Sequence, residues 1–170
     1  MSGGQPAAEA PVVRQPMLNA LLIQEPLALE DPLAEWRWRF GGSARLVALS
    51  RAGDAFLRIA NGQVWWLDCG SGTLTAVAAS VAAFERLLTQ PIEAAKLLMA
   101  PVIEASLRRD GPFQAGICLG FTLLPVLGGS YALENRWRAP AIEHFGLTGE
   151  IHRRLRDAPD GTSVRIDVVD

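Results

Sequence analysis

The sequence predicts an α+β fold in which a mainly antiparallel sheet is packed with three or four helices. From residue 34 to residue 77, short runs of strand-like alternation follow one another between tight turns. The period then changes to that of amphipathic helices, and further strands come later. Strands grouped before helices are typical of α+β proteins. We therefore expect an N-terminal meander of about five strands, with additional strands near the end.

Length and composition favour one globular domain. The chain has 170 residues, of which 49% are hydrophobic and 20% charged. This size suits a single core. We expect residues 34–170 to form that domain and residues 1–33 to be a flexible or loosely packed N-terminal segment.

The same composition indicates a cytoplasmic protein without membrane or nucleic-acid partners. The N-terminal stretch lacks the charged and apolar regions of a secretory signal, and no apolar run approaches the roughly 20 residues of a membrane span. The formal net charge is −2, and no segment gathers the basic residues that phosphate contacts require. The sequence itself leaves the oligomeric state open.

The expected strands begin with EWRWRF, residues 35–40, where aromatic residues alternate with arginines. Residues 44–49 follow as a second strand. Residues 54–60 and 63–68 are expected to form a hairpin around Asn61-Gly62, since this pair favours a type I′ turn. The small residues at 68–72 then turn the chain into a strand at 73–77.

Capping and proline signals place the helices. Ser80 is expected to cap a helix that ends before Pro91, and Pro91 suits the first position of the next one. Pro101 should split that helix near residues 99–100. Asp110-Gly111-Pro112 should end the helical middle.

The C-terminal third is expected to contain a buried strand within 113–121, a helix within 140–157 and a last strand at 163–169. A turn at Asp160-Gly161 would precede that strand. On the helix, His152 lies at the centre of the apolar stripe and is expected to be a hydrogen-bonded core histidine. Gly146 and Gly149 weaken a helix, so at least one should mark a close backbone approach.

Two stretches resemble one bacterial family. Residues 49–88 contain a G-D pair, then G-x-V-x-x-L-D, then S-x-x-x-F; residues 120–162 contain G-F, P-x-L-G-G, E-N, G-x-I-H and D-x-P-D-G-T. In this order the motifs resemble the type VI secretion immunity-like domains, which are more distantly similar to the SMI/KNR-type immunity superfamily. The resemblance implies a non-enzymatic protein whose partner is a toxin effector, often a nuclease.

The residues themselves favour no catalytic, cofactor or metal site. Gly128-Gly129 lacks the lysine and hydroxyl of a phosphate-binding loop, so a tight turn is expected there. A cysteine hydrolase can be assembled from Cys118, His144 or His152, and Asn135 or Asp157. However, Cys118 and Cys69 are both expected to be inert packing thiols, because free cysteines are usually buried. His144 and His152 would lie about 12 Å apart on one helix, too far to share an ion.

A protein interface is the remaining candidate. Trp137 lies between Arg136 and Arg138, in what is expected to be an exposed loop after Glu134-Asn135. Trp and Arg anchor many protein interfaces. We therefore expect binding of a toxin effector as the first function, and a small-molecule or regulatory binding module of the same fold as the alternative; a cysteine hydrolase is the third reading.

Overall fold

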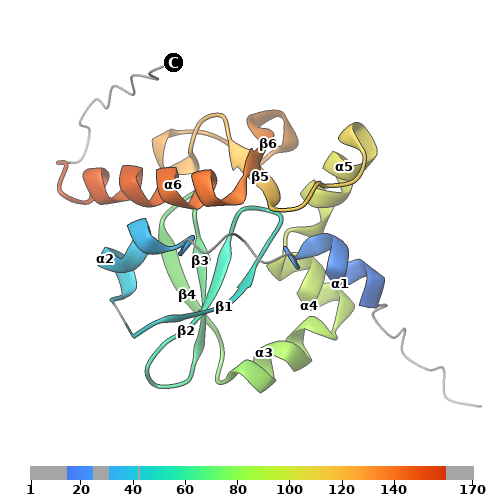
Figure 1. Cartoon of the computed structure of the whole chain (residues 1–170), viewed down its shortest axis with the longest axis horizontal. Helices are drawn as coiled ribbons and strands as arrows, with labels where there is room; N and C mark the ends of the chain where they lie inside the picture. The colour runs from blue at the N-terminus through green and yellow to red at the C-terminus, as the bar shows by residue number, and fades with distance from the viewer. Residues whose placement is uncertain (1–14, 25–30, 42, 160–170) are drawn as a thin grey trace, which may run out of the picture.

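The computed structural model describes residues 15–24, 31–41 and 43–159. Its main sheet is an antiparallel meander of four strands in the order β1 (Arg45–Leu49), β2 (Ala55–Arg58), β3 (Val64–Asp68) and β4 (Thr73–Ala78). A second sheet pairs β5 (Ile117–Phe121) with β6 (Arg136–Pro140) in antiparallel register. The predicted α+β class is thus confirmed (Figure 1).

The meander has four strands instead of about five because residues 34–40 are helical. They form a 3₁₀ turn, η1 (Ala34–Trp36), followed by α2 (Arg37–Phe40). The start of this helical segment follows Asp31, whose carboxylate accepts a hydrogen bond from the Leu33 N–H at 3.0 Å. The predicted strand at residues 35–40 was therefore wrong, although Trp36 is buried and its neighbours are exposed, as alternation suggested.

The hairpin around Asn61-Gly62 is present, with β2 and β3 paired over residues 55–58 and 64–67. Its turn is not type I′, which requires positive φ at both central residues. Gly62 has φ +87, but Met99 is the only non-glycine residue with positive φ in the described ranges. The Gly62 N–H donates to the Ile59 carbonyl at 2.9 Å, so the loop is longer and ends in a left-handed glycine.

The helical middle follows the capping and proline signals. In α3 (Val81–Leu88), the Ser80 hydroxyl accepts a hydrogen bond from the Ala83 N–H at 3.1 Å. Pro91 opens α4 (Pro91–Leu97), and left-handed Met99 separates α4 from α5 (Ala100–Asp110). These predictions are confirmed, since prolines cannot continue a helix from the preceding turn.

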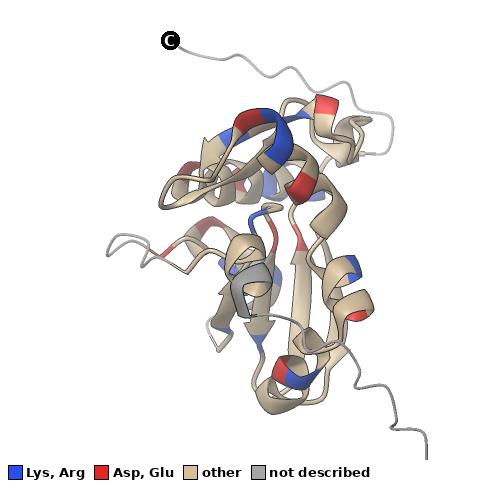
Figure 2. Cartoon of the chain, turned by 90° about the vertical axis from the view of Figure 1, so that its right-hand side faces the viewer, with Lys and Arg blue, Asp and Glu red and all other residues tan. Residues whose placement is uncertain are grey.

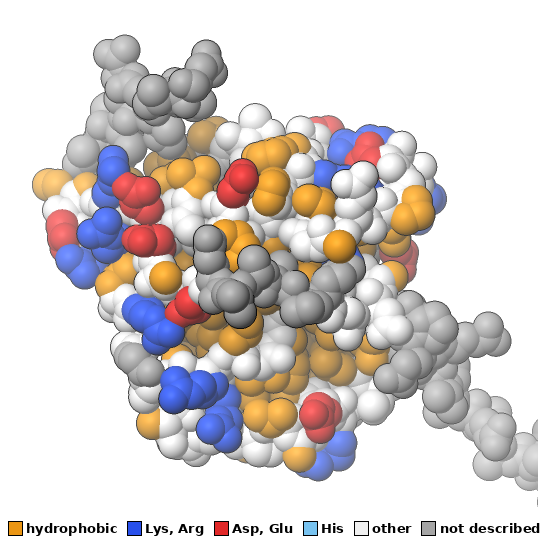
Figure 3. All heavy atoms as spheres, viewed as in Figure 1, with side chains coloured by type: hydrophobic (Ala, Val, Ile, Leu, Met, Phe, Trp, Pro, Cys, Tyr) orange, Lys and Arg blue, Asp and Glu red, His pale blue; other side chains and the backbone are white. Residues whose placement is uncertain are grey.

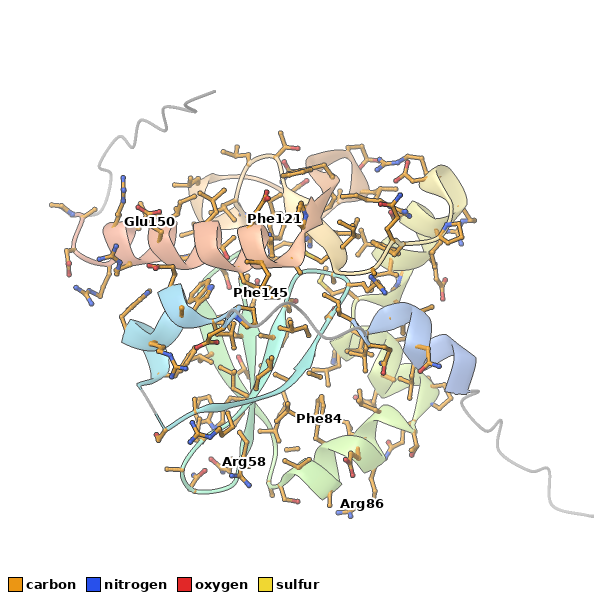
Figure 4. All side chains as sticks on the ribbon, viewed as in Figure 1. Arg58, Phe84, Arg86, Phe121, Phe145 and Glu150 are labelled. Carbon is orange, nitrogen blue, oxygen red and sulfur yellow. The ribbon has the colours of Figure 1, made fainter. Side chains whose placement is uncertain are left out.

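Two cores lie on opposite faces of the main sheet. Alternation sends Phe56 and Val64 toward α3, α4 and α5, where Phe84 and Ile103 are buried. On the other face, side chains from β2 and β3 meet η1 and α6 (Ala141–Arg156). Figure 4 shows Phe84 between α3 and the sheet, and Phe145 on the side of α6 nearest the sheet.

The N-terminal segment contributes to the first core. In α1 (Gln15–Leu21), the Leu21 side chain is buried, and Leu22 pairs with Ser50 in an isolated bridge. The described part of residues 1–33 therefore packs on the sheet. The domain boundary at residue 34 stays a prediction, and residues 160–170, with the expected turn at Asp160-Gly161 and the expected strand at 163–169, lie outside the described residues.

Candidate functional site: an apolar groove beside the last helix

An apolar groove of about 760 Å³ runs between α6, the β5–β6 sheet and the loop that connects these two strands. We call it the α6 groove. Its lining is mostly apolar and comprises Gly120, Phe121, Thr122, Leu123, Leu124, Leu127, Trp137, Ala139, Glu143, His144, Leu147, Thr148 and Ile151. Binding sites are commonly concave, apolar and of this size. The α6 groove is therefore the candidate functional site.

The floor of the groove is a face of the two-stranded sheet. Gly120 pairs directly with Trp137, and Ala139 follows Trp137 at the strand period of two. These three residues therefore share one face. Because Gly120 has no side chain, the Trp137 indole lies close to it, and a Cβ there would be 3.4 Å from the indole nitrogen. The indole N–H donates to the Phe121 carbonyl at 3.3 Å, which orients the ring.

One wall is the loop between β5 and β6, and its two glycines shape it. Gly128 has φ +97 and ends the 3₁₀ turn η2 (Pro125–Leu127), with its N–H donating to the Pro125 carbonyl. At Gly129, a Cβ would lie 1.9 Å from the Leu123 carbonyl oxygen. The glycine pair therefore permits a turn and a close backbone approach, which is a structural role.

Asn135 closes the same loop. It lies in the 3₁₀ turn η3 (Leu133–Asn135), which precedes β6. The side-chain NH₂ of Asn135 donates to the carbonyls of Leu123 and Ser130, both at 2.7 Å. Its side-chain oxygen Oδ1 accepts from the Leu123 N–H at 3.0 Å. The side chain that was expected at an interface therefore holds the groove wall in place.

The opposite wall is the outward stripe of α6. Glu143, Leu147 and Ile151 recur every four residues along the helix and line the groove. The inward stripe of α6 is buried against the rest of the protein and consists of Ala141, His144, Phe145, Thr148, Gly149 and His152. One helix thus joins the core to the groove.

Large apolar side chains are exposed at the groove. The exposed fractions are 47% for Trp137, 57% for Leu147 and 44% for Leu123. In Figure 3, apolar side chains are visible over the upper layer of the molecule around α6, and others are visible over its lower half. Scattered exposed apolar residues are ordinary, but a patch gathered around a groove marks an interaction site.

Arg136 lies beneath the groove and is buried. Its guanidinium donates to the carbonyls of Ala52 at 2.9 Å and Leu119 at 3.2 Å, and it stacks 3.6 Å from the centre of the Phe121 ring. Burial lowers the pKa of this guanidinium, against the opposing attraction of Asp54. The expectation of an exposed Arg-Trp-Arg loop is therefore wrong for Arg136, because these residues form strand β6 and alternate faces.

The other two expected interface residues are placed differently. Arg138 is half-buried, donates to the Pro112 carbonyl at 2.6 Å and covers the Phe113 ring at 4.1 Å. It therefore anchors the segment after α5. Glu134 is exposed on η3. Only Trp137 of the expected set lines the groove.

A buried carboxyl, that of Asp54 just before β2, interacts electrostatically with Arg136. Asp54 follows left-handed Gly53, and its carboxylate accepts the Cys69 N–H at 3.2 Å. Burial, aided by the nearby charge of Asp68, raises the pKa of Asp54 to about 7. Asp68 in turn accepts the Tyr131 hydroxyl at 2.6 Å, which joins β3 to the groove loop.

Both histidines of α6 contact backbone carbonyls of the first half of the chain. His144 Nε2 lies 2.8 Å from the Gly53 oxygen, and burial lowers the pKa of His144 to about 4. His152 Nε2 lies 3.0 Å from the Cys69 oxygen, and burial lowers its pKa as well. Because a carbonyl only accepts, each Nε2 carries the proton of a neutral ring. His152 is thus a hydrogen-bonded histidine in the interior.

The two cysteine thiols are buried in the protein interior. Cys69 and Cys118 are free and fully buried, and burial raises the pKa of Cys118 to about 12 and that of Cys69 well above its usual range. A thiolate nucleophile therefore does not form there at neutral pH.

In the described ranges, no group of three or more His, Cys, Asp or Glu side chains is placed to hold a metal ion. Of the helices described, none combines the length and hydropathy that crossing a bilayer requires.

Residues 78–152 match the family described as the T6SS immunity protein Tdi1, C-terminal, where T6SS denotes the type VI secretion system. This segment is therefore similar to the type VI secretion immunity-like domains. The matched segment is less than half of the 170 residues, yet it contains every residue that lines the α6 groove. No curated protein matches the chain. The predicted family resemblance is confirmed, and it supports an immunity role in general terms.

The motifs of the resemblance, both inside and outside the matched segment, contribute internal hydrogen bonds to the fold. Gly53, Asp68, Asn135 and His152 each belong to a motif, and each accepts or donates an internal hydrogen bond. The groove anchors Trp137, Leu147 and Leu123 lie outside those motifs. Sequence reasoning found Trp137 through its residue type, but it missed Leu123 and Leu147. Leu147 was detectable as an apolar residue away from the buried stripe of the predicted helix, and Leu123 as an apolar residue just after the predicted strand within 113–121.

Proposed function

We propose that this chain is an immunity protein that binds a secreted toxin effector and blocks its active site, without catalysing a reaction itself. The observation that carries the proposal is the exposed apolar α6 groove within the segment that matches the immunity family. The effector is proposed to be a protein toxin, of which a nuclease is one class. We place the formation of this complex in the cytoplasm as part of the same proposal.

The groove has the properties of a protein-binding surface. An oriented tryptophan and neighbouring leucines provide large apolar contact area at little conformational cost. The charges elsewhere are mixed in sign, and Figure 2 shows basic and acidic residues interspersed along the molecule. Apolar contact at the groove is therefore a stronger source of affinity than a one-signed electrostatic field.

The first experiment measures complex formation with the protein encoded in the neighbouring reading frame. Leu147→Asp should weaken binding at least tenfold, because it places a charge in the apolar groove. Ile92→Asp is the matched control, since Ile92 is 80% exposed on α4 and lies outside the groove. Titration calorimetry gives the affinities, and circular dichroism verifies folding.

A growth assay tests the biological role. Cells that express the effector should survive with the wild-type chain and with Ile92→Asp, and lose protection with Leu147→Asp. Normal growth of a deletion strain exposed to the effector would contradict the immunity function. Equal protection by both variants would be consistent with the immunity function but would show that the α6 groove is not needed for it.

A small-molecule binding module is the second candidate, because the groove volume falls within the range of ligand pockets, about 300–1,000 Å³. A thermal-shift screen with metabolites and no protein partner tests it. A rise in Tm that Leu147→Asp abolishes would favour this function. The cysteine hydrolase has no such support, since Cys118 is buried with a raised pKa.

A further inference from the structure

We infer that the α6 groove receives an amphipathic helix of the partner, whose apolar stripe contacts Trp137 and Leu147 and whose Lys or Arg side chain lies beside Glu143. This inference rests on the proposed function, because it names the chemistry of the effector segment that docks. It follows from three properties of the groove: its floor is the face of a sheet, its wall along α6 has a defined length, and its lining carries an acidic residue.

The floor favours a helix over an added strand. Gly120 and Trp137 are a directly opposed pair, so the groove is lined by a sheet face and not by a strand edge. Backbone N–H and C=O groups lie in the plane of a sheet, toward its edges. A strand placed on this face would leave its own backbone groups without ladder partners. A helix satisfies its backbone hydrogen bonds internally and can present side chains alone.

The length of the helical wall sets the length of the partner segment. Glu143 and Ile151 are eight residues apart on α6, which is about 12 Å at the helical rise. A partner helix of two to three turns spans this distance with apolar residues at i, i+4 and i+7. The Trp137 indole at the floor, held by its bond to the Phe121 carbonyl, is a fixed surface for one of these side chains.

The charge of the groove gives the polarity of the partner. Among the residues that the structure describes, Glu143 is the only charged one that lines the groove. It is exposed, and it makes no hydrogen bond or ion pair with the other described residues. The neighbouring acid on α6, Glu150, is already paired with Arg154. Glu143 lies in the first turn of α6, where the helix dipole also favours an acid. A partner cation would add its attraction to this position.

The first test uses the effector complex. Glu143→Gln should weaken binding about threefold and Glu143→Lys about tenfold, as expected for loss and reversal of one partly exposed ion pair. Glu104→Lys is the control with the same change in net charge, because Glu104 is exposed on α5 outside the groove. Thermal unfolding of each variant separates the helix-dipole effect from binding. A complex that forms normally with all three variants would refute the inference and leave the proposed function intact.

The second test does not need the effector. A phage-displayed library of 16-residue helical peptides is selected on the full chain, with Leu147→Asp as the counter-selection. Enrichment of apolar residues at i, i+4 and i+7 together with Lys or Arg supports the inference. Enrichment of alternating, strand-like or acidic peptides overturns it, as does an absence of peptides specific to the wild-type groove.

Two further outcomes concern other occupants of the groove. Concentration-dependent dimers that Leu147→Asp dissolves would show a second copy there and overturn the inference. Selection is also repeated on a chain that ends at residue 159. Peptides that bind only this shortened chain would assign the groove to residues 160–170 and overturn it equally.

Discussion

At the scale of single residues, two buried titratable groups have pKa values that are shifted in opposite directions. The Asp54 carboxyl has a pKa raised from 3.8 to about 7, whereas the His144 imidazole has a pKa lowered from 6.5 to about 4. Burial disfavours the charged form in both cases. Folding thus favours protonation of Asp54 and deprotonation of His144 over nearly the same pH range.

The effects on stability therefore have opposite signs. Between about pH 4 and pH 7, folded Asp54 binds more protons than unfolded Asp54, so its contribution to stability is lost as the pH rises. Between about pH 4 and pH 6.5, folded His144 binds fewer protons, so its contribution grows as the pH rises. His152 acts in the same direction as His144, because its pKa is also lowered.

We predict that replacing either residue exposes the pH dependence of stability that the other one contributes. Relative to wild type, the unfolding free energy of Asp54→Asn should gain a rising slope between pH 4.5 and 6.5, and that of His144→Gln a falling slope. Each slope should approach about 1 kcal/mol per pH unit, since a difference of one bound proton between the folded and unfolded states gives a slope of about 1.36 kcal/mol per pH unit. Urea unfolding followed by tryptophan fluorescence measures both unfolding free energies. If the two differences from wild type changed with pH in the same way, burial would not shift the pKa values of Asp54 and His144 in opposite directions.

At the scale of elements, α6 determines the conformation of residues 34–40. The buried stripe of α6 includes Gly149, and a Cβ there would lie 2.8 Å from the Glu35 carbonyl carbon. The Trp38 indole donates to the Gly149 carbonyl at 3.3 Å. Trp36 lies in the core beside the His152 ring, with centres 5.1 Å apart. The short helical segment thus packs directly against the backbone of α6 at Gly149, where any side chain would prevent this close approach.

The two glycines of α6 give a matched pair of predictions. Gly149→Ala should destabilise the protein by about 1–2 kcal/mol, because overpacking against Glu35 exceeds the gain in helix propensity. Gly146→Ala should stabilise it by about 0.5–1 kcal/mol, since a Cβ at Gly146 meets nothing within 4 Å. Denaturant unfolding measures both; an equal gain for both variants would exclude the close packing of α6 on η1.

At the scale of the whole molecule, side-chain contacts to distant backbone join the main sheet to the groove layer. Arg136 from β6 reaches the Ala52 carbonyl, Tyr131 reaches Asp68, and His152 reaches the Cys69 carbonyl. In Figure 1, α6 and the β5–β6 sheet lie together above the four-stranded sheet. These bonds hold the groove layer in one orientation on the sheet.

Removing the central contact should destabilise the whole domain. Arg136→Met is predicted to cost about 3 kcal/mol, because two buried carbonyls and the Asp54 carboxylate lose their cation. Arg138→Met should cost less, since Arg138 is partly exposed. Adding Asp54→Asn to Arg136→Met should restore part of the stability at pH 8, where Asp54 is charged. Additive effects in this double-mutant cycle would show that the two groups do not interact.

The sequence by itself determined the elements whose signals are local. Ser80, Pro91 and Pro101 fixed the helix boundaries of the middle, because a cap or a missing N–H acts within one turn. The hairpin at Asn61-Gly62 was placed for the same reason. The ordered motifs also predicted the resemblance to the immunity-like domains, which the match over residues 78–152 confirms.

Only the tertiary structure decided which faces are buried. Strand alternation requires Arg136 and Trp137 to point in opposite directions, but the distant carbonyls of Ala52 and Leu119 determine that the arginine is inside. Likewise, alternating burial at Trp36, Arg37 and Trp38 arises in a helical segment because Gly149, more than a hundred residues away, admits it. Local patterns specify periodicity; long-range contacts select the backbone that realises it and the surface left free for a partner.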